Sequence, residues 1–242
     1  MIRFYAPDIE TEGRLPEQES AHCCRVLRLR EGDRIYAIDG KGYSYECLIT
    51  DAHPKGTTVE ILSRSEEPQA WTPRITLAVA PTKNIDRMEW LVEKAVEMGV
   101  DRIVFLQCAR SERKVLKRER IAKIAISAMT QSLKATLPEI SELTGFKDFI
   151  KSCDTPVRVM GYCDKDYPRK EFARNYDGKQ DITILIGPEG DFSPEEVKLA
   201  VECGFQPVTF GNTRLRTETA ALYAVAAVHV LDNLTPTVCG VE

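Results

Sequence analysis

From residue 74 onward the chain alternates between short apolar runs and segments of helical periodicity, and this alternation restricts the fold more than any other feature. The strand-like runs occupy residues 74–81, 102–108, 156–163, 181–187 and 207–211. Helices are expected from about 85 to 99, at 118–133, after Ser193 and after Thr217. Such alternation predicts an α/β fold, in which a parallel sheet carries helices on both faces.

The run at 182–186 is apolar or β-branched at every position, which is typical of a central strand that is covered on both faces. It breaks at a Gly-Pro-Glu-Gly elbow, residues 187–190. Beyond the elbow, Ser193 precedes Pro194, and Glu196 completes the pattern of a helix capping box. The elbow therefore lies between a strand end and a helix start, where open α/β sheets bind ligands.

The chemistry of this elbow narrows the class of ligand. A phosphate-binding loop presents many free backbone N–H groups and usually a lysine. Here Pro188 removes one donor and Glu189 adds negative charge, which disfavours a pyrophosphate and nucleotide-dependent phosphotransfer. A ligand with a neutral ring and some positive charge fits better. The alternative, that the elbow only marks the turn between a strand and a helix, stays open at this point.

Residues 1–70 have a different pattern, with strand-like runs at 3–6, 30–42, 43–52 and 57–64 and a helical segment near 16–27. This pattern predicts a small β-barrel domain. The polar stretch at 65–74 contains two prolines and is typical of an interdomain linker. We therefore expect two domains, at 1–70 and 73–242.

Composition excludes several classes of protein. The chain has no run of about 18 apolar residues, and its first ten residues lack the apolar core of a signal peptide. We expect a cytoplasmic protein with no membrane association. The eight cysteines show no CxxC pair and no cysteine–histidine ligand spacing, so we expect reduced thiols, no disulfide framework and no metal site.

Positive charge is concentrated in one part of a chain whose formal net charge is −4. Between Arg110 and Lys134 there are eight lysines and arginines against two acidic residues, Glu112 and Glu119. This excess fits contacts to RNA phosphates, although a solvated helix face explains it equally well.

The last predicted helix, residues 217–234, is rich in alanine, valine and leucine nearly all round. Such a helix must be buried on more than one side. It lies either deep in its own domain or against another subunit, and we favour a homodimer contact.

A second elbow, FGNTRLRTETA at 210–220, also follows a strand and precedes a helix. The two elbows together resemble those of the 16S rRNA (uracil-N3) methyltransferase family, in the SPOUT superfamily. The resemblance extends to HCCRVLRLREGD, KNIDRMEWLVEKAVEMGV, RSERKV and QSLKATLPEI, and so covers nearly the whole chain. It implies a PUA-like β-barrel, then a SPOUT-type parallel sheet with a C-terminal trefoil knot, in a homodimer. The implied reaction is methylation of N3 of a specific uridine in 16S rRNA of the small ribosomal subunit, with S-adenosyl-L-methionine as the methyl donor.

The resemblance also implies roles for individual residues. Arg216, then Arg214, would stabilise negative charge on the uracil, with Glu218 as a possible base or helix-cap partner. Glu189 would lie near the cationic sulfonium or bind a neighbouring backbone N–H. The implied cofactor-binding residues are Tyr162, Cys163, Gly187, Pro188, Glu189, Gly190, Phe210, Gly211 and Leu215. The predicted RNA-binding residues are Arg25, Arg28, Arg110, Arg113, Lys114, Lys117 and Lys134.

The chain departs from the family at two places. Many members have a second glycine where this chain has Asp191, and Gly-Arg where it has Leu133 and Lys134. Two alternatives remain: a non-catalytic RNA-binding protein, and a SPOUT methyltransferase that acts on another RNA nucleotide. The sequence leaves open the exact nucleotide, the choice between free rRNA and an assembled subunit, the general base and the order of binding.

Overall fold

The computed structural model describes residues 2–164 and 167–234, which form two compact units. The first unit contains the described residues up to Ala70 together with Ala125–Leu137. The second contains Trp71–Ile124 and the described residues from Pro138 onward. The division falls inside helix α4 (Arg118–Gln131), whose C-terminal part belongs to the first unit. Nothing in the sequence indicates that this segment joins the N-terminal domain.

The first unit is built on a sheet of order β1-β2-β3-β4, in which β1 and β2 are parallel and the other pairs antiparallel. Phe4, Ile35 and Tyr45 are fully buried in its core. The predicted strands and the helical segment are confirmed. The elements are β1 (Arg3–Tyr5), α1 (Ile9–Glu12), α2 (Glu17–Ala21), the π-helix η1 (His22–Val26), β2 (Arg34–Ile38), β3 (Tyr43–Asp51) and β4 (Thr58–Glu66).

The second unit is built on a seven-stranded sheet of order β7-β6-β5-β10-β8-β11-β9, with every neighbouring pair parallel. This confirms the predicted parallel sheet. Strand β10 lies in the middle and all five of its residues are buried, as its unbroken apolar run predicts. The strands are β5 (Ile75–Val79), β6 (Arg102–Gln107), β7 (Glu139–Gly145), β8 (Val157–Gly161), β9 (Lys170–Glu171), β10 (Ile182–Ile186) and β11 (Gln206–Thr209).

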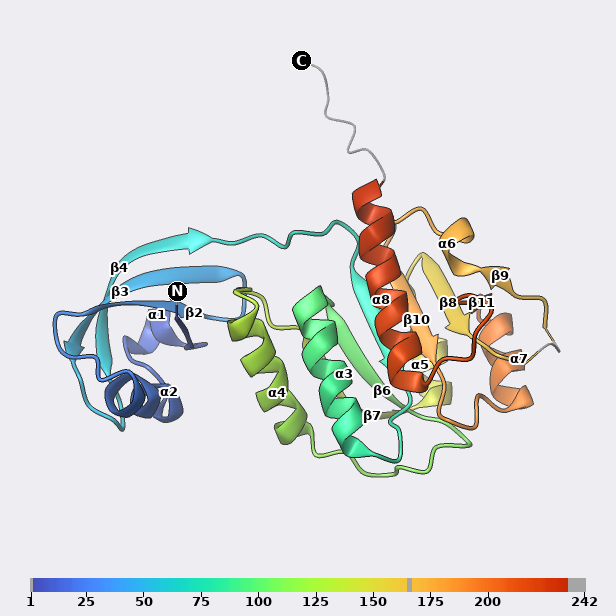
Figure 1. Cartoon of the computed structure of the whole chain (residues 1–242), viewed down its shortest axis with the longest axis horizontal. Helices are drawn as coiled ribbons and strands as arrows, with labels where there is room; N and C mark the ends of the chain where they lie inside the picture. The colour runs from blue at the N-terminus through green and yellow to red at the C-terminus, as the bar shows by residue number, and fades with distance from the viewer. Residues whose placement is uncertain (1, 165–166, 235–242) are drawn as a thin grey trace, which may run out of the picture. The chain divides into compact units, whose positions relative to one another are not determined.

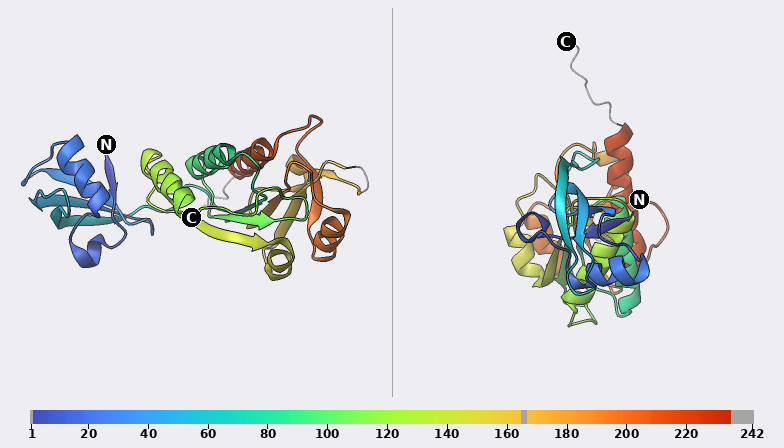
Figure 2. Two further views of the ribbon diagram at one scale, coloured as in Figure 1. Left: turned by 90° about the horizontal axis from the view of Figure 1, so that it is seen from below. Right: turned by 90° about the vertical axis from the view of Figure 1, so that its left-hand side faces the viewer.

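Helices cover both faces of this sheet (Figures 1 and 2). α3 (Ile85–Met98) and α8 (Thr217–Leu234) pack together over one face. α5 (Phe146–Ser152) and α7 (Pro194–Glu202) cover the other, where Phe149 and Val197 join an apolar core with Leu185. The short α6 (Phe172–Asn175) follows β9.

The predicted helix boundaries depend on local hydrogen bonds that the structure contains. Ser193 caps α7 with the full capping box, which is worth about 1 kcal/mol. Asn84 caps α3, and Gly99 ends it with a φ of 113°. The alternating pattern did not predict β7 or β9. β7 has one buried residue among half-buried and exposed ones, and both residues of β9 are exposed, so neither strand carries an apolar run.

Three observations concern the described residues as a set. None of their helices combines the length and apolar character that crossing a bilayer requires. No cluster of three or more histidine, cysteine or acidic side chains suited to a metal ion occurs among them. Seven cysteines are free thiols, and the eighth, Cys239, lies outside the described residues.

Candidate functional site

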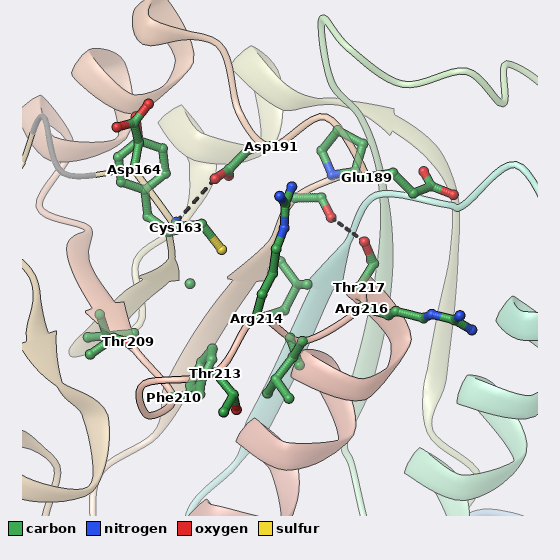
Figure 3. Close-up of a pocket in the computed structure, with 18 of the residues that line it drawn as sticks. Cys163, Asp164, Glu189, Asp191, Thr209, Phe210, Thr213, Arg214, Arg216 and Thr217 are labelled. Atoms are coloured by element: carbon green, nitrogen blue, oxygen red, sulfur yellow. Dashed lines mark hydrogen bonds between the residues drawn. The ribbon is translucent and has the colours of Figure 1, made fainter.

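A pocket of about 930 Å³ opens where β8, β10 and β11 end, within the second unit (Figure 3). Its walls are three loops, residues 161–164, 187–191 and 210–216, together with the first turn of α8. Because all three strands are parallel, their carboxyl ends meet at one edge of the sheet, which is the usual ligand site of an open α/β sheet. The volume suits a small organic ligand.

Hydrogen bonds join these loops. The buried hydroxyl of Thr217, at the start of α8, donates to the carbonyl of Gly187 at 3.1 Å. The Asp191 carboxylate accepts the backbone N–H of Cys163 at 3.1 Å (Figure 3). Arg110 donates to the carbonyl of Gly190 at 2.8 Å. The two elbows, which are separate segments in the sequence, thus form one connected structure with the loop after β8.

Three glycines in these walls occupy positions where a larger residue is unfavourable. A Cβ at Gly161 would lie 2.7 Å from Phe210 Cε2, closer than real Cβ contacts allow, and one at Gly187 would lie 3.1 Å from Phe192. Gly211 has a φ of 102°, which side chains disfavour. The space beside Gly161 and Gly187 is therefore filled by neighbouring aromatic side chains, and Gly211 is favoured by its backbone conformation.

Every predicted cofactor-binding residue lines this pocket. Tyr162 is buried and Cys163 exposed, and the ring of Phe210 packs against Phe172 and Tyr223. The Glu189 carboxylate accepts the backbone N–H of Lys83 at 3.0 Å, so the second of its two predicted roles has a partner in the structure.

The three predicted catalytic residues also line the pocket. Arg214 and Arg216 are exposed, and neither forms an ion pair within the described residues. Arg214 extends toward the loop of Asp191, whereas Arg216 points to the side opposite Cys163 (Figure 3). The two guanidinium groups therefore serve different parts of the site.

Glu218 differs from the two arginines in being buried, with 7% of its side chain exposed. Its Oε1 lies 3.7 Å from Nε of Arg87 on α3. Its Oε2 is buried and has no hydrogen-bond partner within the part of the chain that the structure describes. A buried carboxylate oxygen without a donor is costly, and this suggests that a ligand supplies one.

The pKa of Cys163 is shifted by its place in the pocket. Partial burial of its thiol raises the pKa, and the charge of Asp191 raises it further, while Arg214 and Arg169 partly offset these effects. The side chain is therefore a neutral thiol at neutral pH.

The predicted RNA-binding residues are distributed over both units. The guanidinium groups of Arg110 and Arg113 donate hydrogen bonds to backbone carbonyls. Arg110 donates to Gly190, and Arg113 donates to Thr82 and Lys83. Lys114 and Lys117 are exposed. Arg25, Arg28 and Lys134 lie in the first unit, the two arginines exposed and Lys134 half-buried.

Both departures from the family pattern occur at backbone positions that favour glycine. Leu133 has a φ of 58° and Asp191 a φ of 61°. Glycine adopts such angles at no steric cost, so it would fit at both positions.

Several residues that line the pocket were not predicted from the sequence, among them Gly161, Arg87 and Arg169. In the sequence, Gly161 is only a glycine near the end of a predicted strand, which does not mark it as a site residue. Arg87 lies on a predicted helix that is recognised by its apolar face, and the pattern says nothing about its polar residues. Arg169 donates to the carbonyls of Tyr162 and Cys163, at 3.2 and 2.8 Å. It follows a stretch without any strand pattern, so nothing in the sequence places it at the pocket.

Comparisons with known proteins point to one family. Residues 69–229 match the model of an RNA methyltransferase domain, and residues 15–62 that of an RNA methyltransferase PUA domain. The ribosomal RNA small subunit methyltransferase E of Aquifex aeolicus is 30% identical, over 90% of this chain and 93% of its own.

Solved structures agree with these matches. A probable rRNA-methyltransferase from Porphyromonas gingivalis is 45% identical, with a TM-score of 0.92 over 96% of this chain and 99% of its own. The ribosomal RNA small subunit methyltransferase E from Neisseria gonorrhoeae, solved bound to S-adenosyl methionine, is 30% identical, with a TM-score of 0.83 over 96% of this chain and 98% of its own.

Proposed function

The chain belongs to the RNA methyltransferase family whose members combine this catalytic domain with a PUA domain, and from this we propose that it methylates N3 of a uridine in small-subunit ribosomal RNA. S-adenosyl-L-methionine is the methyl donor. The observation that carries the proposal is the pocket at the ends of β8, β10 and β11, which the two elbows and the start of α8 enclose.

The pocket suits this donor in shape and chemistry. Its tight, glycine-containing walls let backbone groups approach an adenine ring closely. We assign the elbow 187–190 to one wall and Phe210, Gly211 and Leu215 to the other, with Tyr162 and Cys163 at the end of β8. Bound there, the cofactor supplies an electrophilic methyl group next to two exposed arginines of the same pocket.

Uridine N3 carries a proton and becomes a nucleophile when that proton leaves. In the transfer, the bond from sulfur to methyl breaks, the bond from methyl to N3 forms, and the N3 proton goes to a base. Arg216 or Arg214 stabilises the negative charge that develops on a uracil carbonyl. Glu218, whose buried Oε2 atom has no hydrogen-bond partner among the described residues, is the candidate base for that proton.

Three further features belong to the same proposal. The C-terminal part of the sheet is threaded as a trefoil knot, which is what the resemblance to the family implies. The protein is a homodimer, and the large apolar side chains that α8 exposes, Tyr223, Val230 and Leu234, are candidates for the contact between subunits. It acts in the cytoplasm.

Transfer of a labelled methyl group to small-subunit RNA tests the function. We expect label only when S-adenosylmethionine and RNA are both present, and mass spectrometry of the nucleosides should identify 3-methyluridine. RNA binding without transfer would instead support a non-catalytic RNA-binding protein. A different methylated nucleoside would support the third possibility, a methyltransferase with another target.

We expect the double variant Lys114→Ala, Lys117→Ala to weaken RNA binding and to reduce its salt dependence. Both lysines are exposed, and binding of a lysine to a phosphate releases a counterion. The slope of the logarithm of the binding constant against the logarithm of the salt concentration should therefore fall in magnitude by about 0.7 for each phosphate-binding lysine removed, for single-stranded RNA. Affinity for the cofactor should not change. The variant Lys147→Ala, Lys151→Ala removes the same charge from exposed positions of α5 and serves as the control. An unchanged slope in the first variant would assign these lysines to a solvated surface.

A further inference from the structure

Asp191 combines an unfavourable backbone conformation with a central position in the pocket. Its φ of 61° makes it one of three non-glycine residues with a positive φ in the described parts of the chain. It closes the elbow, since its backbone N–H donates to the carbonyl of Pro188 at 2.9 Å. Aspartate tolerates this region better than most residues, but glycine adopts it without steric cost. The side chain must therefore offer something that glycine lacks.

That contribution is a carboxylate that binds two loops at once. Oδ1 accepts the N–H of Phe192 at 2.8 Å, within its own loop. Oδ2 accepts the N–H of Cys163 at 3.1 Å, in the loop after β8 (Figure 3). Hydrogen bonds to an ionised acceptor are about twice as strong as those between neutral groups. One side chain thus joins the end of β8 to the elbow after β10.

We propose that Asp191 is a positioning residue, whose carboxylate fixes the spacing between these two loops and so prepares the pocket for S-adenosylmethionine. The inference rests on the proposed function, because it concerns the same pocket and ligand. Both loops are walls of that pocket. A ligand that must order its own walls loses affinity, so a preformed spacing strengthens binding.

The effect should appear in binding and not in the chemical step. Asp191→Gly keeps the positive φ without strain but removes both acceptors. We expect it to weaken the affinity for S-adenosylhomocysteine about tenfold, the change that corresponds to one charge-assisted hydrogen bond. The KM for S-adenosylmethionine should rise by a similar factor. The single-turnover rate at saturating cofactor and RNA should stay within about twofold, because no reacting atom is touched.

Calorimetry on the full-length chain with S-adenosylhomocysteine is the decisive experiment, using Asp191→Gly, Asp191→Ala and Asp191→Asn. If the carboxylate only relieved local strain, glycine would bind as well as the natural protein and alanine worse. The proposal instead expects glycine and alanine both to bind weakly, and asparagine, which keeps one acceptor oxygen, to be intermediate.

Glu202→Gln removes one negative charge from an exposed position of α7 and serves as the control. Thermal melting checks that each variant is folded, and Asp191→Asn, which keeps the side-chain shape, covers the case in which the others unfold. Natural affinity in a folded Asp191→Gly variant would overturn the inference. Absence of binding by the natural protein would overturn the proposed function instead.

Discussion

Arg216→Ala is expected to lower the single-turnover rate of methyl transfer about a hundredfold, the usual consequence of losing one donor that stabilises developing negative charge. Arg216 directly precedes α8, lines the pocket and forms no ion pair within the described residues, so its charge is available to a substrate. Arg216→Lys should recover only part of the rate, because a point charge does not reproduce the planar guanidinium. Affinities for cofactor and RNA should change far less.

Arg214→Ala is the matched comparison, since it removes the same group from the same loop. The two arginines point to different sides of the pocket, so we expect their effects on the rate to be unequal (Figure 3). The rate is measured with labelled methyl at saturating cofactor and RNA, which separates chemistry from binding. A near-normal rate for Arg216→Ala would assign that residue to structure and transfer the role to Arg214.

Gly161→Ala is expected to lower the affinity for S-adenosylmethionine by roughly 10- to 100-fold. The added Cβ would lie 2.7 Å from Phe210 Cε2 and 3.1 Å from Ile186 Cδ1, so Phe210 must move. Phe210 is part of the proposed wall for the cofactor. Overpacking by one methyl group costs about 1–3 kcal/mol, which sets the size of the effect.

Gly56→Ala is the control for this prediction. It makes the same substitution in the first unit, where an added Cβ meets no atom within 4 Å and φ is not positive. Calorimetry measures the affinity of both variants, and circular dichroism confirms that they are folded. If a folded Gly161→Ala variant bound the cofactor normally, the contact between the loop after β8 and Phe210 would not belong to the cofactor site.

Much of the fold follows from local patterns that translate directly into structure. The apolar run at 182–186 predicts a buried central strand, because a strand that is covered on both faces has no solvent-facing side on which polar residues would alternate. Ser193 and Glu196 predict the start of α7 because the capping box closes within a single helical turn. β7 lacked such a signal, since only one of its seven residues is buried and its pairing with β6 is long-range.

The candidate site was likewise predictable from the sequence only in its local features. The elbow at 187–190 and the segment 210–216 were visible in the sequence as glycine-containing turns after strands, and every predicted cofactor residue lines one pocket. The sequence did not indicate how the side chains are used. Arg110 and Arg113 look like RNA-binding residues in a cationic run, yet their guanidinium groups bind backbone carbonyls.

By itself, the sequence determined the parallel sheet, the helix caps and the two elbows, because periodicity, capping and turn chemistry act between residues close in the chain. Only the tertiary structure decided which loops meet. The hydrogen bond from Cys163 to Asp191 spans 28 residues, and that from Thr217 to Gly187 spans 30. Such contacts depend on strand order, here β10-β8-β11, and strand order is set by the packing of the whole sheet and its helices. The pocket exists because the three strands are parallel and this order makes their carboxyl ends neighbours.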